Sequence, residues 1–407
     1  MDIFKTADIL VPGSADMEKW AVIACDQFTS EPEYWARAEA LVGDAPSALH
    51  LMLPEAWLEK ERARGAEERI NTAMEQYLAN GTFRVLRDSF VYLERIQSDG
   101  RLRRGLVGAV DLEEYDFTPG SAAAIRSTED TVADRLPPRV RVRKGAALEM
   151  PHVMVLMDDQ NDSVLGSLEA EKDTLEKVYD FELMQQSGHI TGWQVCGRVA
   201  DRVSAAIRAL GSGRDMVMAM GDGNHSLATA RLCWLDIRET LSEAERLTHP
   251  ARFALVELNN IHETAIDFEP IHRLLMDTES GPFLAEAQRF FGDVSRAGEE
   301  HRIRCIAAEG ERELVVTGLT IGETIGAAER FALDYLRRHG GRIDYIHGDD
   351  TVAAMGREKN ACAMVLPAMD KTELFRSVEC SGPFPRKSFS IGHARDKRFY
   401  LECRKIR

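Results

Sequence analysis

The chain of 407 residues lacks the features that mark membrane, secreted and disulfide-bonded proteins. No window approaches 18 uninterrupted apolar residues, so we expect no membrane span. Residues 1–13 have no cationic region followed by an apolar one, so we expect no secretory leader. The seven cysteines are scattered without a CxxC pair, which is typical of reduced thiols in the cytoplasm. We therefore predict a soluble cytoplasmic protein.

Common catalytic motifs and an excess of positive charge are also missing. The sequence contains no HExxH helix, no zinc-type Cys/His spacing, no GxSxG elbow and no GxxxxGK[ST] loop. The 51 lysines and arginines face 67 acidic residues, which leaves a net charge of −16. This balance argues against nucleic-acid binding, because such binding requires a clustered basic face.

The order of predicted elements indicates a mixed α+β fold with two to three subdomains. A chain of this length is too long for one small core. Apolar runs typical of strands alternate with helical stretches, and the hairpin signal at 98–100 argues against a regular Rossmann repeat. We predict mixed sheets divided among an N-terminal segment (1–115), a central segment (116–280) and a C-terminal segment (281–407).

Residues 216–231 are the most informative stretch of the chain. An apolar run (216–220) stops at Gly221-Asp222-Gly223-Asn224-His225-Ser226, and a helix-forming run follows. This pattern predicts a strand, a tight turn and a helix N-terminus, which together bind anions. The alternative is a simple capped turn with Asn224 or Ser226 as the cap. A cap needs only one polar side chain and this turn offers four, so we favour a ligand site.

Asp222 suits two chemical roles in such a turn. A carboxylate beside a phosphate is favourable when a Mg²⁺ ion lies between them. It is equally suited to act as a general base toward a hydroxyl group. The dinucleotide-binding fingerprint fits poorly, because its third glycine is absent and Asp222 would place negative charge beside a pyrophosphate.

A second stretch, residues 125–143, is rich in arginine. Glu129 stands there among Arg126, Arg135, Arg139, Arg141 and Arg143. Pro137 and Pro138 predict an extended backbone, so the alternation at 139–143 would place three arginines on one face of a strand. Convergent guanidinium groups bind phosphates or carboxylates. The alternative interpretation is an exposed strand of mixed charge.

Further candidate ligand contacts lie elsewhere in the chain. His189 occupies a glycine-flanked turn (187–193) between two stretches predicted to be helical, a loop able to close on a ligand. His347 lies close to Asp349 and Asp350 in the sequence and is a candidate ligand contact. The alternative interpretation of this stretch is a strand followed by an Asp-rich turn. Arg386 and Lys387 follow a proline-stiffened loop and are candidate phosphate contacts.

Sequence blocks along nearly the whole chain resemble the domain-of-unknown-function 1015 family of bacteria and archaea. The blocks are ACDQFTSEPEYW (24–35), IRSTEDT (125–131), LPPRVRVR (136–143), MGDGNHSLATAR (220–231), NIHE (260–263), FEPIHR (268–273), IDYIHGDD (343–350) and PRKSFS (385–390). They follow the family's order. The resemblance implies one family domain, but the family has no settled activity.

The turn at 222–226 is also similar, more loosely, to that of the ParB/sulfiredoxin superfamily. Many DUF1015 members carry Asp-Gly-His-His-Arg there, and the superfamily's Asp-Gly-x-x-Arg turn holds nucleotide phosphates. Its free-serine kinases use an acidic residue to activate the substrate hydroxyl. The resemblance implies that residues 222–225 form the phosphate and substrate turn. The usual arginine is Ser226 here, so an arginine of 126–143, or Arg386 and Lys387, would supply that charge.

Two functional hypotheses follow. The first is a nucleotide-dependent, Mg²⁺-assisted kinase of a small hydroxyl metabolite such as serine, in which Asp222 binds Mg²⁺ or activates the hydroxyl. His225 would orient the transferred group, and Glu129 is the second candidate base. The residues expected to bind phosphate or nucleotide are Gly221, Gly223, Asn224, Ser226, Arg126, Arg139, Arg141, Arg386 and Lys387. His189 and His347 are expected to contact the substrate.

The second hypothesis is a sensor that binds a nucleotide or phosphorylated metabolite without turnover. The arginines and the turn serve both hypotheses equally well. In either case the expected partner is a small anionic ligand. The sequence leaves the oligomeric state open, a homodimer included.

Overall fold

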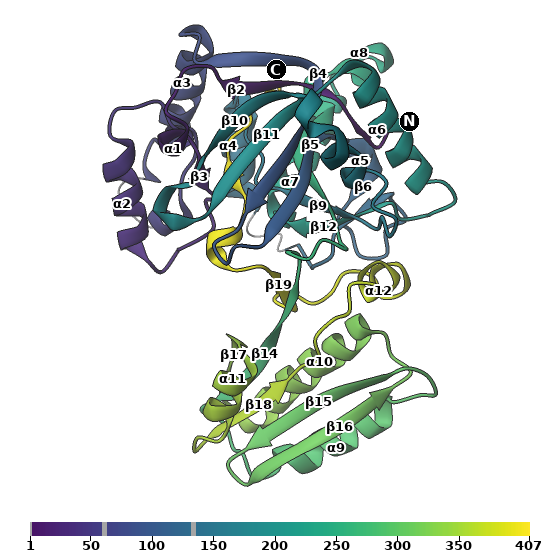
Figure 1. Ribbon diagram of the computed structural model, residues 1–407. Helices are drawn as coiled ribbons and strands as arrows, with labels where there is room; N and C mark the ends of the chain where they lie inside the picture. Colours follow the sequence, from purple (N-terminus) through teal and green to yellow (C-terminus); the bar gives the residue numbers. More distant parts are fainter. Residues whose placement is uncertain (1, 59–62, 132–135) are drawn as a thin grey trace.

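The computed structural model describes residues 2–58, 63–131 and 136–407 and has two lobes (Figure 1). The larger lobe contains the elements from β1 to β13 together with the last residues, and the smaller lobe follows in green. Both lobes combine sheets with helices, which confirms the predicted mixed α/β fold. Within the described residues, no helix has the length and apolar character needed to cross a membrane.

The larger lobe is built on a mixed eleven-stranded sheet. Its main path runs β10 (Glu176–Glu182), β11 (His189–Val195), β4 (Phe83–Ile96), β5 (Leu102–Asp111), β13 (Phe253–Asn260), β9 (Met154–Met157), β12 (Met218–Asp222), β7 (Ile125–Arg126) and β6 (Tyr115–Asp116). Off this path, β1 (Phe4–Lys5) pairs with β5 and β2 (Ala7–Pro12) pairs with β4. The pairs β13–β9, β12–β7 and β6–β7 are parallel, and the others are antiparallel.

Alternating side chains on the central strands divide the core of this lobe into two layers. On β4, Val91 and Leu93 join one hydrophobic cluster, whereas Phe90 and Tyr92 join the other, as the two-residue period of a strand requires. The first layer is covered by α2 (Pro32–Val42) and α3 (Ala66–Ala79). The second is covered by α5 (Leu165–Glu171), α6 (Gly197–Leu210) and α7 (Asn224–Arg238). In the part of this lobe that the structure describes, the other α-helices are α1 (Met17–Trp20), α4 (Leu136–Gly145) and α8 (Glu243–Thr248).

The smaller lobe packs helices against an antiparallel six-stranded sheet. The sheet runs β16 (Gly310–Thr317), β15 (Glu300–Ala307), β18 (Ala361–Val365), β14 (Phe268–Met276) and β17 (Arg342–His347), and β19 (Phe389–Ile391) pairs with β14. Its helices are α9 (Phe283–Val294), α10 (Ile321–His339) and α11 (Asp349–Gly356), and α12 (Glu373–Ser381) follows toward the other lobe.

The end of the chain returns to the larger lobe. There β20 (Phe399–Tyr400) pairs with β3 (Val22–Ile23), and β21 (Arg404–Lys405) pairs with β8 (Leu148–Glu149). The Trp20 indole also donates to the carbonyl of Leu401 at 2.8 Å. Residues far apart in the sequence thus build one core, and the returning segment carries Lys397 toward the start of α7.

A network of fully buried charges lies beside this returning segment. Glu257 on β13 is completely buried, and Arg103 and Arg398 form ion pairs with it. Burial by itself would raise the pKa of Glu257, but the two arginines lower it to about 2. These two ion pairs therefore stabilise the fold at pH values above 4.5, the usual pKa of a glutamate. Their contribution is lost as the pH falls toward 2.

We expect Glu257→Gln to lower the free energy of unfolding by about 3–5 kcal/mol at pH 7. The substitution leaves two buried guanidinium groups without their shared carboxylate. Urea unfolding followed by circular dichroism measures the change. The exposed Glu68→Gln on α3 serves as a matched control and should cost less than about 1 kcal/mol. Equal stability of the two variants would show that the Glu257 ion pairs do not stabilise the fold.

Candidate functional site

The predicted strand, turn and helix are present at residues 218–238. β12 ends at Asp222, and α7 begins at Asn224 with Gly223 as its N-cap. Gly223 has φ +82°, and a β-carbon there would lie 3.1 Å from the Cα of Val153. Only glycine adopts this conformation in this space without strain. The glycine of the motif is therefore required by the turn itself.

Asp222 forms an ion pair with a lysine from the far end of the chain. The Lys397 ammonium lies 3.2 Å from Oδ2 of Asp222 and also donates to the carbonyl of Ile391 at 2.9 Å. Burial alone would raise the pKa of Asp222, but Lys397 and His152, with the N–H of Gly223, lower it below its usual value. Asp222 is therefore a fixed negative charge at neutral pH.

The segment 127–129 is held against the turn by hydrogen bonds. The Ser127 hydroxyl donates to Oδ1 of Asn224 at 2.6 Å, and the Thr128 hydroxyl donates to the carbonyl of Met220 at 2.7 Å. On its other side, the N–H of Phe384 donates to the carbonyl of Thr128. These bonds fix the backbone that carries Glu129.

Glu129 is a buried carboxyl group of this site whose pKa is far from its usual value. Its Oε1 accepts a hydrogen bond from the N–H of Ser388 at 3.1 Å. Burial raises the pKa of Glu129 to about 7, and the charge of Asp222 adds to the increase against main-chain hydrogen bonds from residues 387–389. A carboxyl group with this pKa exchanges a proton near neutral pH, as a general acid or base requires.

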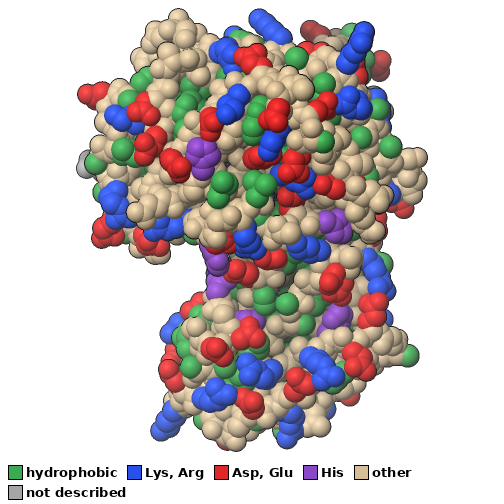
Figure 2. All heavy atoms as spheres, in the orientation of Figure 1, with side chains coloured by type: hydrophobic (Ala, Val, Ile, Leu, Met, Phe, Trp, Pro, Cys, Tyr) green, Lys and Arg blue, Asp and Glu red, His purple; other side chains and the backbone are tan. Residues whose placement is uncertain are grey.

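These groups line one cavity of about 180 Å³ at the waist between the lobes. Its charged and histidine side chains are Glu129, Asp222, Lys397, Lys387 and His347. The last two come from the smaller lobe and the loop beside it, so both lobes contribute to the cavity. Figure 2 shows charged side chains of both signs and histidines gathered along this waist.

Two buried arginines position the loop that carries Lys397. Arg95 on β4 donates to the carbonyls of residues 395, 396 and 397, and Arg103 on β5 donates to the carbonyl of Asp396. The Asp396 carboxylate accepts from the N–H and hydroxyl of Ser98. The loop is therefore anchored by charge-assisted hydrogen bonds, which hold geometry well.

Other candidate residues on the turn have separate contacts. Ser226 bonds through its hydroxyl to Nε2 of His152 at 3.0 Å, and the rings of His152 and Tyr400 pack in a T-shaped arrangement. Gly221 and Asn224 line the cavity, and the carbonyl of His225 accepts from the Thr229 hydroxyl.

The prediction of an arginine-bearing strand at 139–143 is wrong. These residues form α4, with Pro137 near its start, where a helix tolerates proline because the first N–H groups lack helical partners. A helix directs alternate residues to different sides. Arg139, Arg141 and Arg143 therefore form ion pairs with three separate carboxylates, namely Glu55, Glu67 and Glu149. Arg135 lies outside the described residues.

These arginines line a different cavity, of about 670 Å³, on the side of α7 that carries Ser226. Arg126 lies next to the site instead, in a hollow of about 240 Å³, and its Nε donates to the carbonyl of Ala123. Lys387 lines the small cavity with its ammonium 4.6 Å from the Tyr345 ring centroid, whereas Arg386 does not line it.

The prediction of a loop around His189 is also wrong. His189 begins β11, and the preceding stretch, predicted to be helical, contains β10. Tyr179 and Phe181 of β10 have the aromatic side chains that strands favour, and this strand pairs with β11. His189 forms ion pairs with Asp180 at 2.7 Å and Glu182 at 3.0 Å, apart from the cavity at the waist.

Two residues of the site carry no sequence signal. Lys397 stands in an ordinary polar stretch, and His152 follows a lone proline. Lys397 reaches the turn because the end of the chain returns to the larger lobe, and His152 reaches it from the loop before β9. The site therefore combines a fixed carboxylate, a proton-exchanging carboxyl and cations from both lobes. Such a set suits an anionic substrate and a proton transfer.

Several solved structures show a remote likeness to this chain. Free serine kinase in complex with AMP is 10% identical, with 72% of this chain and 93% of that chain covered and a TM-score of 0.35. The truncated SbnI from Staphylococcus aureus is 9% identical over 70% and 82% of the two chains, with a TM-score of 0.34. A conserved hypothetical protein from Pyrococcus furiosus is 10% identical over 70% and 90%, with a TM-score of 0.33.

The comparison with protein families identifies one family. No curated protein matches the sequence significantly. Residues 12–371 match the family model described as a protein of unknown function, DUF1015. This match spans both lobes and includes the turn at 221–226. The chain belongs to the DUF1015 family.

Proposed function

We propose that this protein is a nucleotide-dependent phosphotransferase that acts on a small hydroxyl metabolite, with serine as the first acceptor to test. The observation that carries the proposal is the pairing of Glu129, whose pKa is raised to about 7, with the Asp222–Lys397 ion pair at the start of α7. Phosphoryl transfer depends mainly on positioning and charge stabilisation. This pairing combines both with a proton acceptor.

In the proposed reaction, Glu129 accepts the proton of the acceptor hydroxyl. The hydroxyl oxygen attacks the terminal phosphorus of the nucleotide, and the bond from that phosphorus to the bridging oxygen breaks. Lys397 and Lys387 stabilise the charge on the phosphoryl oxygens. The N-terminus of α7, fifteen residues long, adds the positive end of its dipole.

Asp222 supplies the oxygen donors that would hold Mg²⁺. This ion is usually bound by one or two carboxylates together with substrate phosphates, and Asp222 lines the cavity in which the phosphoryl group is proposed to lie. Bound there, Mg²⁺ would neutralise phosphate charge. Among the described residues, the one compact trio of metal-ligating side chains is Glu299, His301 and Glu373 in the smaller lobe, away from this turn.

The two cavities beside the turn suit different parts of the reactants. The cavity of about 180 Å³ has room for a phosphoryl group and a small acceptor. The cavity of about 670 Å³ has the volume of a small-molecule site, and Arg139 and Arg141 line it together with Ser226. In the proposal the nucleoside occupies this larger space, while Arg126 and His225 contribute at the phosphate end and His347 at the acceptor end.

A thermal-shift series tests nucleotide binding. We expect one of ATP, ADP or CTP to raise the melting temperature in a Mg²⁺-dependent way, because binding to the folded state at 100 times Kd adds about 2.7 kcal/mol. Pyrophosphate and phosphate complete the series. Lys397→Met should abolish the shift, and the control variant Lys19→Met, at a half-buried position outside the cavity, should retain it.

Turnover then separates the two functional hypotheses. Transfer of the terminal phosphoryl group from the stabilising nucleotide to serine or another small hydroxyl compound would support the kinase. A shift without transfer to any acceptor would support the sensor. Absence of a shift with every compound would remove the nucleotide from the proposal.

A further inference from the structure

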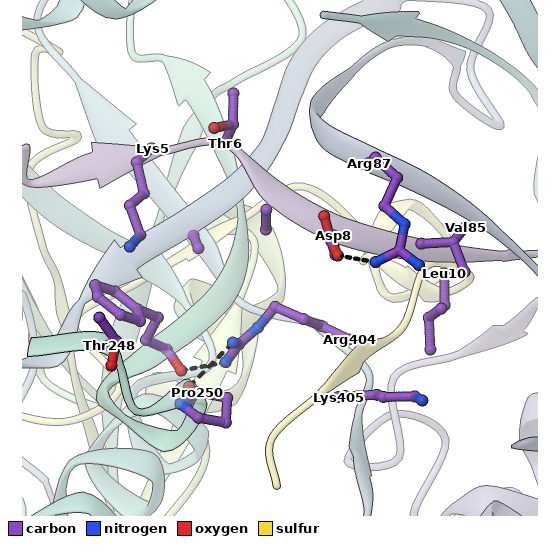
Figure 3. A pocket seen from close by; sticks show the side chains of 13 residues that line it. Lys5, Thr6, Asp8, Leu10, Val85, Arg87, Thr248, Pro250, Arg404 and Lys405 are labelled. Carbon is purple, nitrogen blue, oxygen red and sulfur yellow. Dashed lines mark hydrogen bonds and ion pairs between the residues drawn. The ribbon is translucent and has the colours of Figure 1, made fainter. Parts of the chain in front are cut away.

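A separate cavity of about 340 Å³ lies on the larger lobe where β1, β2 and β21 meet (Figure 3). Its walls come from both ends of the chain, from β4 and β5, and from the segment between α8 and β13. None of its residues lines the cavity at the waist. Its volume falls within the range of small-molecule sites.

Positive charge dominates this cavity in an otherwise acidic protein. Lys5, Arg87, Arg404 and Lys405 line it, and Asp8 is its one carboxylate. Asp8 is engaged by Arg87 at 2.7 Å. In the described part of the chain, Lys5 and Lys405 have no carboxylate within 4.0 Å. Two of the four cations therefore lack an ion-pair partner.

The buried Arg404 adds to this excess of charge. It bonds to Glu149 and donates to the carbonyls of Pro250 and Phe253. Arg143 binds the same carboxylate at 2.6 Å, so two arginines share a single negative charge. In Figure 3 the Lys5 ammonium and the Arg404 guanidinium lie on one side of the hollow, and the Arg87–Asp8 pair lies on the other.

Lys5 itself is held in an apolar setting. Its ammonium lies 3.3 Å from the centroid of the Phe253 ring. Burial lowers the pKa of Lys5, and Arg404 and Arg252 contribute in the same direction against the opposite effect of Asp111. An anion beside this amine would replace lost solvation and stabilise its charged form.

The remaining walls are apolar. Leu10, Ala109 and Phe253 are buried side chains that face this space, and Val85 and Pro250 complete it. A bare inorganic anion would leave these surfaces in contact with water. An organic body would cover them and gain the free energy of apolar burial.

We propose that this cavity binds a small organic anion with an apolar body, whose charged group lies between Lys5 and Arg404. The proposal is independent of the proposed phosphotransferase, because the two cavities share no residue. Its ligand class is set by the excess of positive charge around Lys5 and Arg404 and by the apolar walls beside them.

Chemical labelling of the unmodified protein tests this site residue by residue. Pyridoxal 5′-phosphate is an aromatic anion with an aldehyde, which condenses with a neutral lysine amine to an imine and releases water. Borohydride then transfers a hydride to the imine carbon while the nitrogen takes a proton, which leaves a stable secondary amine. Peptide mass spectrometry measures the labelling rate of each lysine.

We expect Lys5 to be labelled at least tenfold faster than the exposed lysines. Naphthalene-1-sulfonate, an organic anion without an aldehyde, should slow labelling of Lys5 at least fivefold and leave the exposed lysines unchanged. A rate at Lys5 equal to that of the exposed lysines would overturn the proposal. Lack of protection by naphthalene-1-sulfonate would overturn it as well.

Equilibrium dialysis with naphthalene-1-sulfonate provides a second measurement. The Lys5→Met variant should lose one bound molecule per chain relative to the wild type. Lys177→Met, which removes a surface lysine paired with Asp180, is the matched control and should lose none. An unchanged stoichiometry in Lys5→Met would count against the site.

Discussion

Asp222→Asn is expected to reduce phosphoryl transfer at least about 100-fold. The substitution removes the charge that holds Lys397 at 3.2 Å and the carboxylate proposed to bind Mg²⁺. Anion binding should persist or tighten, because a negative charge leaves the cavity while Lys397 stays. Single-turnover assays with ATP and serine measure the transfer, and calorimetry with pyrophosphate measures the binding.

The matched control for this variant is Asp158→Asn. Asp158 also forms ion pairs, with His262 at 2.7 Å and Arg214 at 3.3 Å, but it does not line the cavity. Its substitution should leave turnover within about twofold of the wild type, as expected for a surface ion pair. Full turnover in Asp222→Asn would show that Asp222 has no catalytic role.

Glu129→Gln is expected to lower turnover about 10²–10⁴-fold, the usual contribution of a general base. In the wild type, activity should rise with pH and level off above about 7, where Glu129 has lost its proton. This limb of the pH profile should vanish in the variant. A profile with the same limb in both proteins would assign the proton transfer to another group.

Stability gives a readout of Glu129 that does not depend on activity. The folded protein holds this proton more tightly than the unfolded chain, because the pKa of Glu129 rises from 4.5 to about 7. Stability therefore falls as the pH rises through this window. The wild type should lose on the order of 3 kcal/mol relative to Glu129→Gln between pH 4.5 and pH 8.

Urea unfolding at pH 4.5 and pH 8 measures this difference. Glu358→Gln, at an exposed position beyond α11, is the matched control and should follow the wild type at both pH values. A wild-type protein that keeps the same offset from Glu129→Gln at both pH values would show that the Glu129 carboxyl is not desolvated.

Local patterns were sufficient to predict some elements and misleading for others. The apolar run followed by two glycines and polar residues predicted the strand, turn and helix at 216–231, because each of these signals acts over a few residues. The alternation at 139–143 suggested a strand but belongs to α4. Alternating charges do not by themselves distinguish a strand from a helix, because the ion-pair partners help to decide which is formed. Here the partners are Glu55, Glu67 and Glu149.

The sequence by itself determined the mixed fold class and the turn at 221–226, since short-range patterns are sufficient for these. It also determined the family, through sequence blocks spread along nearly the whole chain. Only the tertiary structure placed Lys397 beside Asp222, Ser388 beside Glu129 and Lys5 beside Arg404. These pairs are separated by 175 to 399 residues along the chain. Electrostatic contacts depend on distance in space, and burial of Glu129 in a waist formed by two lobes sets its pKa.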